Sequence, residues 1–314
     1  MKITLDIDKL LAEGKIDQTD YDTLRSLAAT ETTSLGLNIL LGFGVVAVAG
    51  GMLALLASAA ASIAIGLGVL GFGIYLAHFY ADRWNMLSSI SILIGALMFG
   101  GGIITQTKGS LGGFVLLALI YLAAGFATKS GLMVTLSAFA VLGTIGAIAG
   151  YEHAFYYVGV EHPLLTIVVF SILAAAAFFA SGRFAPEDKH LFIVFSRASV
   201  FIVNMGFWIG SLWGDNLFRP RDTWDPVRSV IPDLVFVLAW AIALVLLGIW
   251  AVRNNRRWLV NILAVFGGIH FYTQWFERLG ASPGTVVLAG LIAIGISLAL
   301  FRYNRQPSES SAFA

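Results

Sequence analysis

Long stretches of apolar residues are the feature of this sequence that most constrains its fold. A helix needs about 20 mostly apolar residues to cross about 30 Å of hydrocarbon, and only helices or closed barrels satisfy their backbone there. Ten segments meet this requirement: 35–57, 59–80, 86–104, 111–128, 131–150, 164–181, 191–213, 231–252, 257–276 and 283–301. The sequence therefore predicts an all-α, polytopic integral membrane protein with about ten transmembrane helices. Counts of eight or nine stay open, because 59–80 and 131–150 are rich in Gly and Ala.

The composition supports a membrane location and excludes several functions. Hydrophobic residues make up 58% of the chain and charged residues 12%, whereas soluble domains carry about 25% charged residues. A net charge of +1 provides no basic surface for nucleic acid. The absence of cysteine excludes disulfides, zinc–thiolate sites, iron–sulfur clusters and cysteine nucleophiles. No phosphate-binding loop, hydrolase elbow or zincin motif is present, so no cofactor is predicted.

The distribution of Lys and Arg predicts the orientation in the membrane. On a ten-helix topology, most of the 19 Lys and Arg residues lie on the side that holds both ends of the chain. Because positive residues are enriched in cytoplasmic loops, we expect both termini to lie in the cytoplasm. The predicted organisation is a cytoplasmic helical hairpin (1–33), a transmembrane domain (34–303) and a disordered cytoplasmic tail (304–314), in a bacterial cytoplasmic membrane.

Residues 1–33 contain two short amphipathic segments. Gly14 is expected to end the first helix, and Asp17 to cap the start of the second. A hairpin this small buries little core of its own, so we expect it to dock on the membrane domain or on another protein. The apolar residues that would make this contact are Leu10, Leu11, Ile16, Tyr21 and Leu24.

Both ends of the chain resemble a known family. The phrase LLAEGKIDQTDYDTLRSLA before the first apolar segment is similar to the start of uncharacterised bacterial membrane proteins catalogued as domain of unknown function 2157. The phrase RRWLVNILAVFGGIHFYTQWFERLG near the C-terminus is similar in style to that family. The resemblance implies a helical hairpin followed by many apolar helices, and it implies no activity and no catalytic residue.

Small residues and one possible repeat bear on how the helices pack. Gly66, Gly68, Gly71 and Gly73 make one segment rich in small residues, and Gly146 and Gly150 form a further spaced pair. Such residues let helix backbones approach closely in lipid. In addition, segment 82–106 resembles segment 255–274: both begin with Arg-Trp and end with Thr-Gln. A parallel repeat of this kind occurs in transporters.

A loop with two Glu-His pairs is a candidate metal site. Glu152 and His153 lie before a run of aromatic residues, and Glu161 and His162 lie after it. Imidazole and carboxylate together suit zinc, copper or manganese, but a site needs three or four ligands that converge. The alternative is an exposed polar loop at the level of the lipid headgroups.

Two helix faces carry polar residues within the predicted membrane region and form a candidate intramembrane site. The spacing of seven places Arg197, Asn204 and Ser211 on one face, and His270, Gln274 and Glu277 share another. From the helical rise, Asn204 and His270 lie at similar depths, so we expect segments 191–213 and 257–276 to be close, with His270 directed into the protein. The alternative is a hydrogen bond that only holds helices together, with Arg197 reaching the membrane surface.

Three functions remain open. Sparse intramembrane polarity and the hairpin favour a non-enzymatic accessory, assembly or scaffold subunit of an envelope complex. The possible repeat and the two polar faces favour a secondary transporter or channel for a small solute. The Glu-His loop and His270 favour an intramembrane enzyme or a metal-handling protein.

Overall fold

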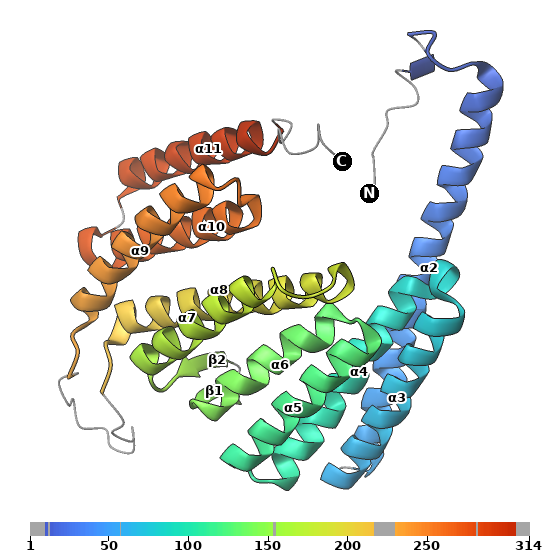
Figure 1. The fold of residues 1–314 in the computed structure, drawn as a ribbon, viewed down its shortest axis with the longest axis horizontal. Helices are drawn as coiled ribbons and strands as arrows, with labels where there is room; N and C mark the ends of the chain where they lie inside the picture. The colour runs from blue at the N-terminus through green and yellow to red at the C-terminus, as the bar shows by residue number, and fades with distance from the viewer. Residues whose placement is uncertain are drawn as a thin grey trace. The chain divides into compact units, whose positions relative to one another are not determined.

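The structure is a computed structural model that describes residues 10–305 except 12, 57, 153–154, 217–229 and 281. It consists of helices and one β-hairpin (Figure 1). The elements are α2 (Gln18–Leu56), α3 (Ala59–Phe79), α4 (Ala81–Gln106), α5 (Leu111–Thr128), α6 (Gly131–Thr144), β1 (Ala147–Glu152), β2 (Phe155–Val160), α7 (Pro163–Ala180), α8 (Pro186–Trp213), α9 (Asp233–Arg253), α10 (Arg257–Gln274), the π-helical η1 (Trp275–Leu279) and α11 (Pro283–Arg305).

Among the described residues, six helices are long and apolar enough to cross a membrane, namely α3, α4, α5, α7, α8 and α9. The chain is therefore a multi-pass helical membrane protein, as predicted. The expected count of about ten spans is not supported. Helix α6 has only 14 residues, which cover about 21 Å. Arg257, Asn261 and His270 make α10 more polar than the six. Where side chains are described, the apolar parts of α2 and α11 are Leu40–Met52 and Pro283–Ala299, each shorter than 18 residues.

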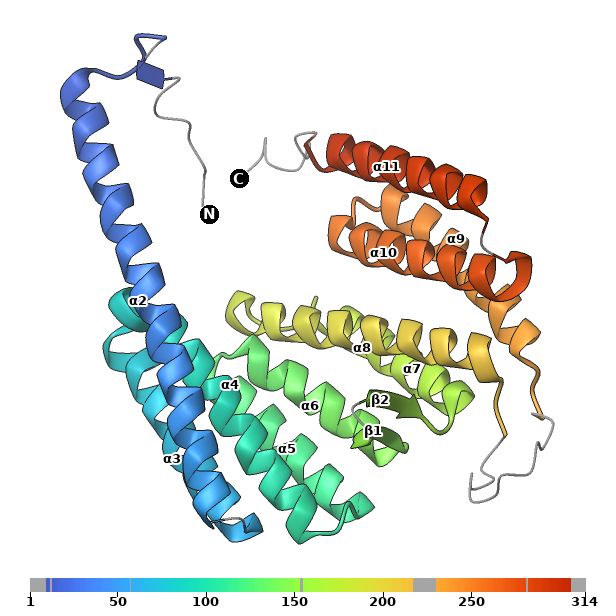
Figure 2. The same cartoon turned by 180° about the vertical axis from the view of Figure 1, so that it is seen from behind.

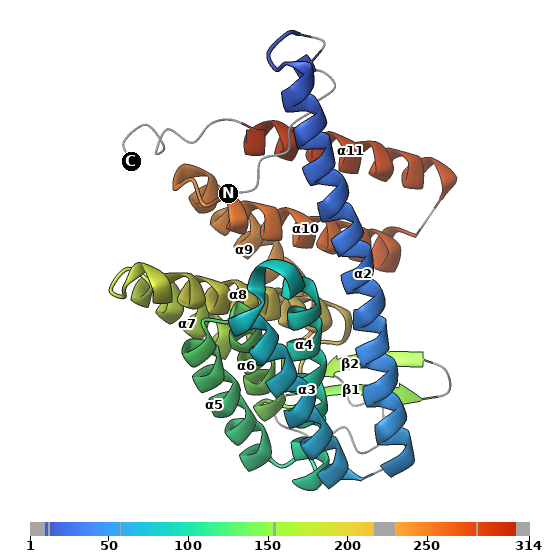
Figure 3. The same cartoon turned by 90° about the vertical axis from the view of Figure 1, so that its right-hand side faces the viewer.

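The segment predicted as a helix over 131–150 instead ends in a β-hairpin. Helix α6 stops at Thr144, and Gly146 has a φ of +96°, which a helix cannot contain. Strands β1 and β2 then pair antiparallel, from Ala147 opposite Val160 to Glu152 opposite Phe155 (Figure 3). The phrase FYYVGV is rich in aromatic and β-branched residues, which favour strands. Gly146 and Gly150 therefore make no helix–helix contact.

The N-terminal segment begins as predicted and then departs from the prediction. Gly14 has a φ of +67°, and the amides of Gly14 and Lys15 donate to the carbonyls of Leu11 and Leu10, which ends the first helix. The Asp17 carboxylate accepts from the Asp20 amide at 2.6 Å, which confirms the predicted cap. The predicted second hairpin helix and the first apolar segment instead form one continuous helix, α2, of 39 residues. Helix α2 contains no proline that would interrupt it.

The chain divides within α5 into two compact units, residues 1–117 and 118–314. In unit 1, α3 and α4 lie side by side and antiparallel, with α2 along them (Figures 1 and 2). Glycines at a spacing of seven line the seam between α3 and α4: Gly66 and Gly73 on α3, and Gly95 and Gly102 on α4. A Cβ added to Gly95 would lie 2.3 Å from the backbone nitrogen of Leu70, so the backbones are in direct contact.

Two serines complete this glycine seam. The hydroxyl of Ser62 donates to the carbonyl of Met98, and that of Ser88 donates to the carbonyl of Gly73, both at 2.8 Å. Gly68 and Gly71, which also belong to α3, face open space, with no neighbouring atom within 4 Å of where a Cβ would lie. Of the four glycines predicted to pack α3, therefore, Gly66 and Gly73 contact α4 and the other two do not.

In unit 2, α7 and α8 form a close pair, and α9 packs against both α8 and α10 (Figure 2). Helices α6, α7 and α8 share a core around Ala138, Phe170 and Ile202. The Ser196 hydroxyl donates to the carbonyl of Ala174 at 3.0 Å and so links α8 to α7. Side chains of the facing helices, more than backbone contact, hold this unit together.

Candidate functional site

Trp240 of α9 lies at the centre of the polar cluster in unit 2. Its side chain is fully buried, and its indole Nε1–H donates to Oδ1 of Asn204 on α8 at 2.9 Å. The Asn204 Nδ2 donates to the carbonyl of Val200 in its own helix at 2.8 Å. Both ends of the buried Asn204 amide therefore have a hydrogen-bond partner, and one of these bonds joins α8 to α9.

His270 of α10 also contacts the Trp240 ring. The two ring centroids are 4.8 Å apart at an interplanar angle of 73°, an edge-to-face arrangement. His270 is half-buried, and its Nδ1 is buried without a hydrogen-bond partner among the described residues. Asn204 and His270 are thus brought together through Trp240 and not by a direct bond.

A second indole also links α8 to α10. The Nε1–H of Trp208 donates to the Thr273 hydroxyl at 3.0 Å. The expected approach of segments 191–213 and 257–276 is therefore present. Sequence reasoning missed Trp208, Trp240 and Thr273, although Trp240 carried a usable signal. It stands in the middle of an apolar helix, far from the headgroup region, where its N–H needs a protein partner.

Arg197 and Ser211 do not join this cluster. Arg197 is exposed, and its guanidinium carbon lies 5.3 Å from the centroid of the Trp258 ring in the first turn of α10. Helix α8 begins at Pro186, before the predicted start at residue 191, and Arg197 lies level with the start of α10. Ser211 is buried and donates to the carbonyl of Trp208 in its own helix.

Gln274 and Glu277 also lie apart from the contact between His270 and Trp240. The side-chain oxygen of Gln274 accepts from the Nε of Arg278 at 2.8 Å, and Arg278 forms an ion pair with Asp233 at 2.6 Å. Glu277 is exposed. Of the six candidate residues, the structure therefore brings only Asn204 and His270 together, through Trp240.

The candidate metal ligands show no convergence within the described residues. Glu161 is exposed, and His162 is half-buried at the N-cap position of α7. His153 and the side chain of Glu152 lie outside the description. Across the described parts of the chain, no three His, Asp or Glu side chains are grouped as metal ligands would be.

Asp215 is a buried carboxylate whose role sequence reasoning missed. Its side chain is 3% exposed, and Oδ2 accepts from the backbone N–H of Leu164 at 2.8 Å, in the first turn of α7. Its backbone also pairs with Ile231 in an isolated bridge. A carboxylate at a helix N-terminus satisfies a free amide and complements the helix dipole. Asp215 therefore anchors the chain between α8 and α9 to the start of α7.

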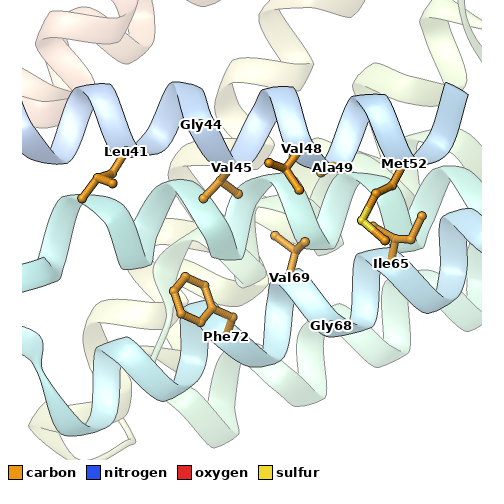
Figure 4. A pocket seen from close by; sticks show the side chains of 10 residues that line it. All are labelled: Leu41, Gly44, Val45, Val48, Ala49, Met52, Ile65, Gly68, Val69 and Phe72. Carbon is orange, nitrogen blue, oxygen red and sulfur yellow. The ribbon is translucent and has the colours of Figure 1, made fainter. Parts of the chain in front are cut away.

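Apolar side chains dominate the linings of two grooves in the described structure. In unit 1 a groove of about 410 Å³ lies between α2 and α3, where Leu41, Val48, Val69 and Phe72 project toward a common space (Figure 4). In unit 2 a groove of about 290 Å³ lies between α10 and α11, with Phe271 and Ile292 in its wall. Both grooves are therefore suited to hydrocarbon chains.

No protein family, no curated protein and no solved structure matches the chain. The resemblance of its two ends to the bacterial family named above therefore stays a prediction.

Proposed function

We propose that this protein is a non-enzymatic accessory, assembly or scaffold subunit of a bacterial envelope complex. One observation carries the proposal: the polar groups at the centre of unit 2 serve helix packing. Trp240 bonds to Asn204 and Trp208 bonds to Thr273, so three helices are joined by these side chains. Interhelical hydrogen bonds of this kind hold membrane helices in place. A rigid bundle suits a subunit that positions a partner.

The partner contact is proposed to lie on the N-terminal segment. Leu10, Leu11, Ile16, Tyr21 and Leu24 are only half-buried in the folded chain. This leaves apolar surface that a partner protein would cover. The same α2 helix continues into the apolar groove against α3, so the segment has a firm attachment to unit 1.

Co-purification from native membranes tests the proposal. The full chain, solubilised in a mild detergent, is expected to carry a partner in fixed stoichiometry. Deletion of residues 1–30 should remove that partner and leave the membrane domain inserted, whereas deletion of residues 306–314 should have no effect. A truncated protein that keeps every interaction of the full chain contradicts the docking role.

The proposed location is the bacterial cytoplasmic membrane with both termini in the cytoplasm. The distribution of Lys and Arg supports this orientation. Reporter fusions at residues 2 and 314 test it. A reporter that is active only in the periplasm should be silent at both positions, and activity at either one reverses the assignment of that terminus.

One observation favours transport as a second function. The Nδ1 of His270 is buried without a described partner, although imidazole changes its charge near pH 6.5 when unperturbed. On this alternative, proton-coupled movement of a small solute requires His270. Uptake into liposomes at pH 5 to 8, compared between the natural chain and His270→Gln, tests it. Gln keeps hydrogen-bonding capacity and removes titration, so unchanged uptake across this range reduces His270 to a packing residue.

A further inference from the structure

Two arginines at the end of unit 2 where α10 begins lie on aromatic rings. The guanidinium carbon of Arg197 is 5.3 Å from the centroid of Trp258, and that of Arg256 is 5.1 Å from the centroid of Phe178. Arg256 directly precedes α10, and Trp258 lies in its first turn. Both contacts therefore belong to one level of the bundle, where α7 and α9 end and α10 begins.

Neither arginine is neutralised by an acidic side chain within the described parts of the chain. The described ion pairs involve Lys15, Lys129 and Arg278, and both Arg197 and Arg256 are exposed. An aromatic ring orients one face of a guanidinium but leaves its five N–H donors directed outward in the plane. These donors are therefore presented to whatever lies beside this end of the bundle.

Exposed aromatic side chains lie close to the two arginines. The Phe178 ring lies 6.0 Å from that of Trp250, which is 40% exposed, and Phe179 is 70% exposed. Trp side chains are enriched at the boundary between hydrocarbon and headgroups, and exposed Phe side chains beside them can face hydrocarbon. A ligand that meets both the guanidinium groups and these side chains must combine an anionic group with hydrocarbon, which a soluble anion lacks.

We propose that Arg197 and Arg256 bind the phosphate groups of anionic phospholipids. The planar fork of a guanidinium matches two phosphate oxygens, and stacking on Trp258 and Phe178 holds each fork in a fixed plane. The acyl chains of the bound lipids lie against the exposed aromatic side chains below. On the proposed orientation, this end of unit 2 faces the cytoplasmic leaflet, whose lipids carry negative charge.

Lipid binding to the purified full chain tests this site. Native mass spectrometry in detergent would compare phosphatidylglycerol with phosphatidylcholine for the natural chain and for the Arg197→Gln, Arg256→Gln and double variants. We expect the natural chain to prefer phosphatidylglycerol. Each single variant should lower its affinity about fivefold, the value typical of one arginine near a charged membrane, and the double variant about twentyfold.

Arg302→Gln is the matched control, because Arg302 is also exposed but belongs to the last turn of α11. It should leave phosphatidylglycerol binding unchanged; an equal loss of affinity in Arg302→Gln would reduce the effect to net charge and overturn the site.

Millimolar inorganic phosphate should not displace the lipid, and displacement would assign the site to a soluble anion. If the Gln variants unfold, Arg197→Lys with Arg256→Lys keeps both charges but loses the forks. Natural affinity in that variant contradicts the proposed geometry.

Discussion

The helices of unit 1 and the helices of unit 2 are packed by different kinds of contact. In unit 1, Gly66 and Gly95 bring the backbones of α3 and α4 into contact, and serine hydroxyls bond to carbonyls across the seam. In unit 2, the indoles of Trp208 and Trp240 reach polar groups on neighbouring helices. The first solution depends on the absence of side chains and the second on large ones. The same lipid environment thus allows two kinds of packing, and each should fail under a different substitution.

Gly95→Leu should have the largest effect. A Cβ at Gly95 would lie 2.3 Å from the nitrogen and 2.7 Å from the Cα of Leu70, and neither backbone atom can move without separating α3 from α4. We expect a loss of about 3 kcal/mol or more in the free energy of unfolding, measured by denaturant titration in micelles. Gly101→Leu on the same helix is the control, because nothing lies within 4 Å of its Cβ position. Equal stability of the two variants would contradict the seam.

Trp240→Phe tests the corresponding link in unit 2. It removes the N–H and leaves the buried Asn204 oxygen without a donor, so unfolding should become easier by about 1 to 2 kcal/mol. Trp250→Phe is the matched control, since Trp250 is 40% exposed. A double-mutant cycle with Asn204→Leu should show coupling between the two sites. Strict additivity would mean that the bond contributes nothing.

Helix caps extend the comparison at a smaller scale. In unit 1, Ser58 caps α3 by accepting from Ala61, three residues along the chain, whereas in unit 2 Asp215 caps α7 from 51 residues away. Asp215→Ala should cost about 1 kcal/mol, and Asp215→Asn less, because an amide oxygen still accepts from Leu164. Thermal unfolding of both variants checks this order. A cost for Asn as large as that for Ala would argue against capping.

His270→Gln should have the smallest effect. The ring makes an edge contact with Trp240 but no described hydrogen bond through Nδ1, so its replacement should change stability by less than about 1 kcal/mol. The packing interpretation further expects the difference between variant and natural chain to be the same at pH 5 and pH 8. A difference that varies with pH would show that His270 titrates in the folded protein and would favour the transport alternative.

The sequence predicted features that depend on residues close together in the chain, and it did not predict hydrogen bonds between residues far apart in the chain. The predicted helix over 111–128 matches α5, and the cap at Asp17 was predicted because its partner lies three residues away. The bond of Trp240 could not be predicted, because its acceptor is 36 residues away and is set by how α8 and α9 pack. The predicted segment 191–213 also falls short of the start of α8. An apolar window detects only the hydrocarbon part of a helix, and α8 begins earlier, at Pro186.

The unbroken length of α2 determines how far the turn at Gly14 lies from the groove against α3. Its 39 residues extend about 58 Å, roughly twice the thickness of the hydrocarbon. The helix is therefore about 28 Å longer than one thickness of hydrocarbon, and the turn at Gly14 precedes its N-terminal end. Because one unbroken helix joins the groove to that turn, a rotation of α2 about its axis would turn the N-terminal segment by the same angle. A protein bound to the N-terminal segment, as proposed above, would therefore respond to rotation of α2.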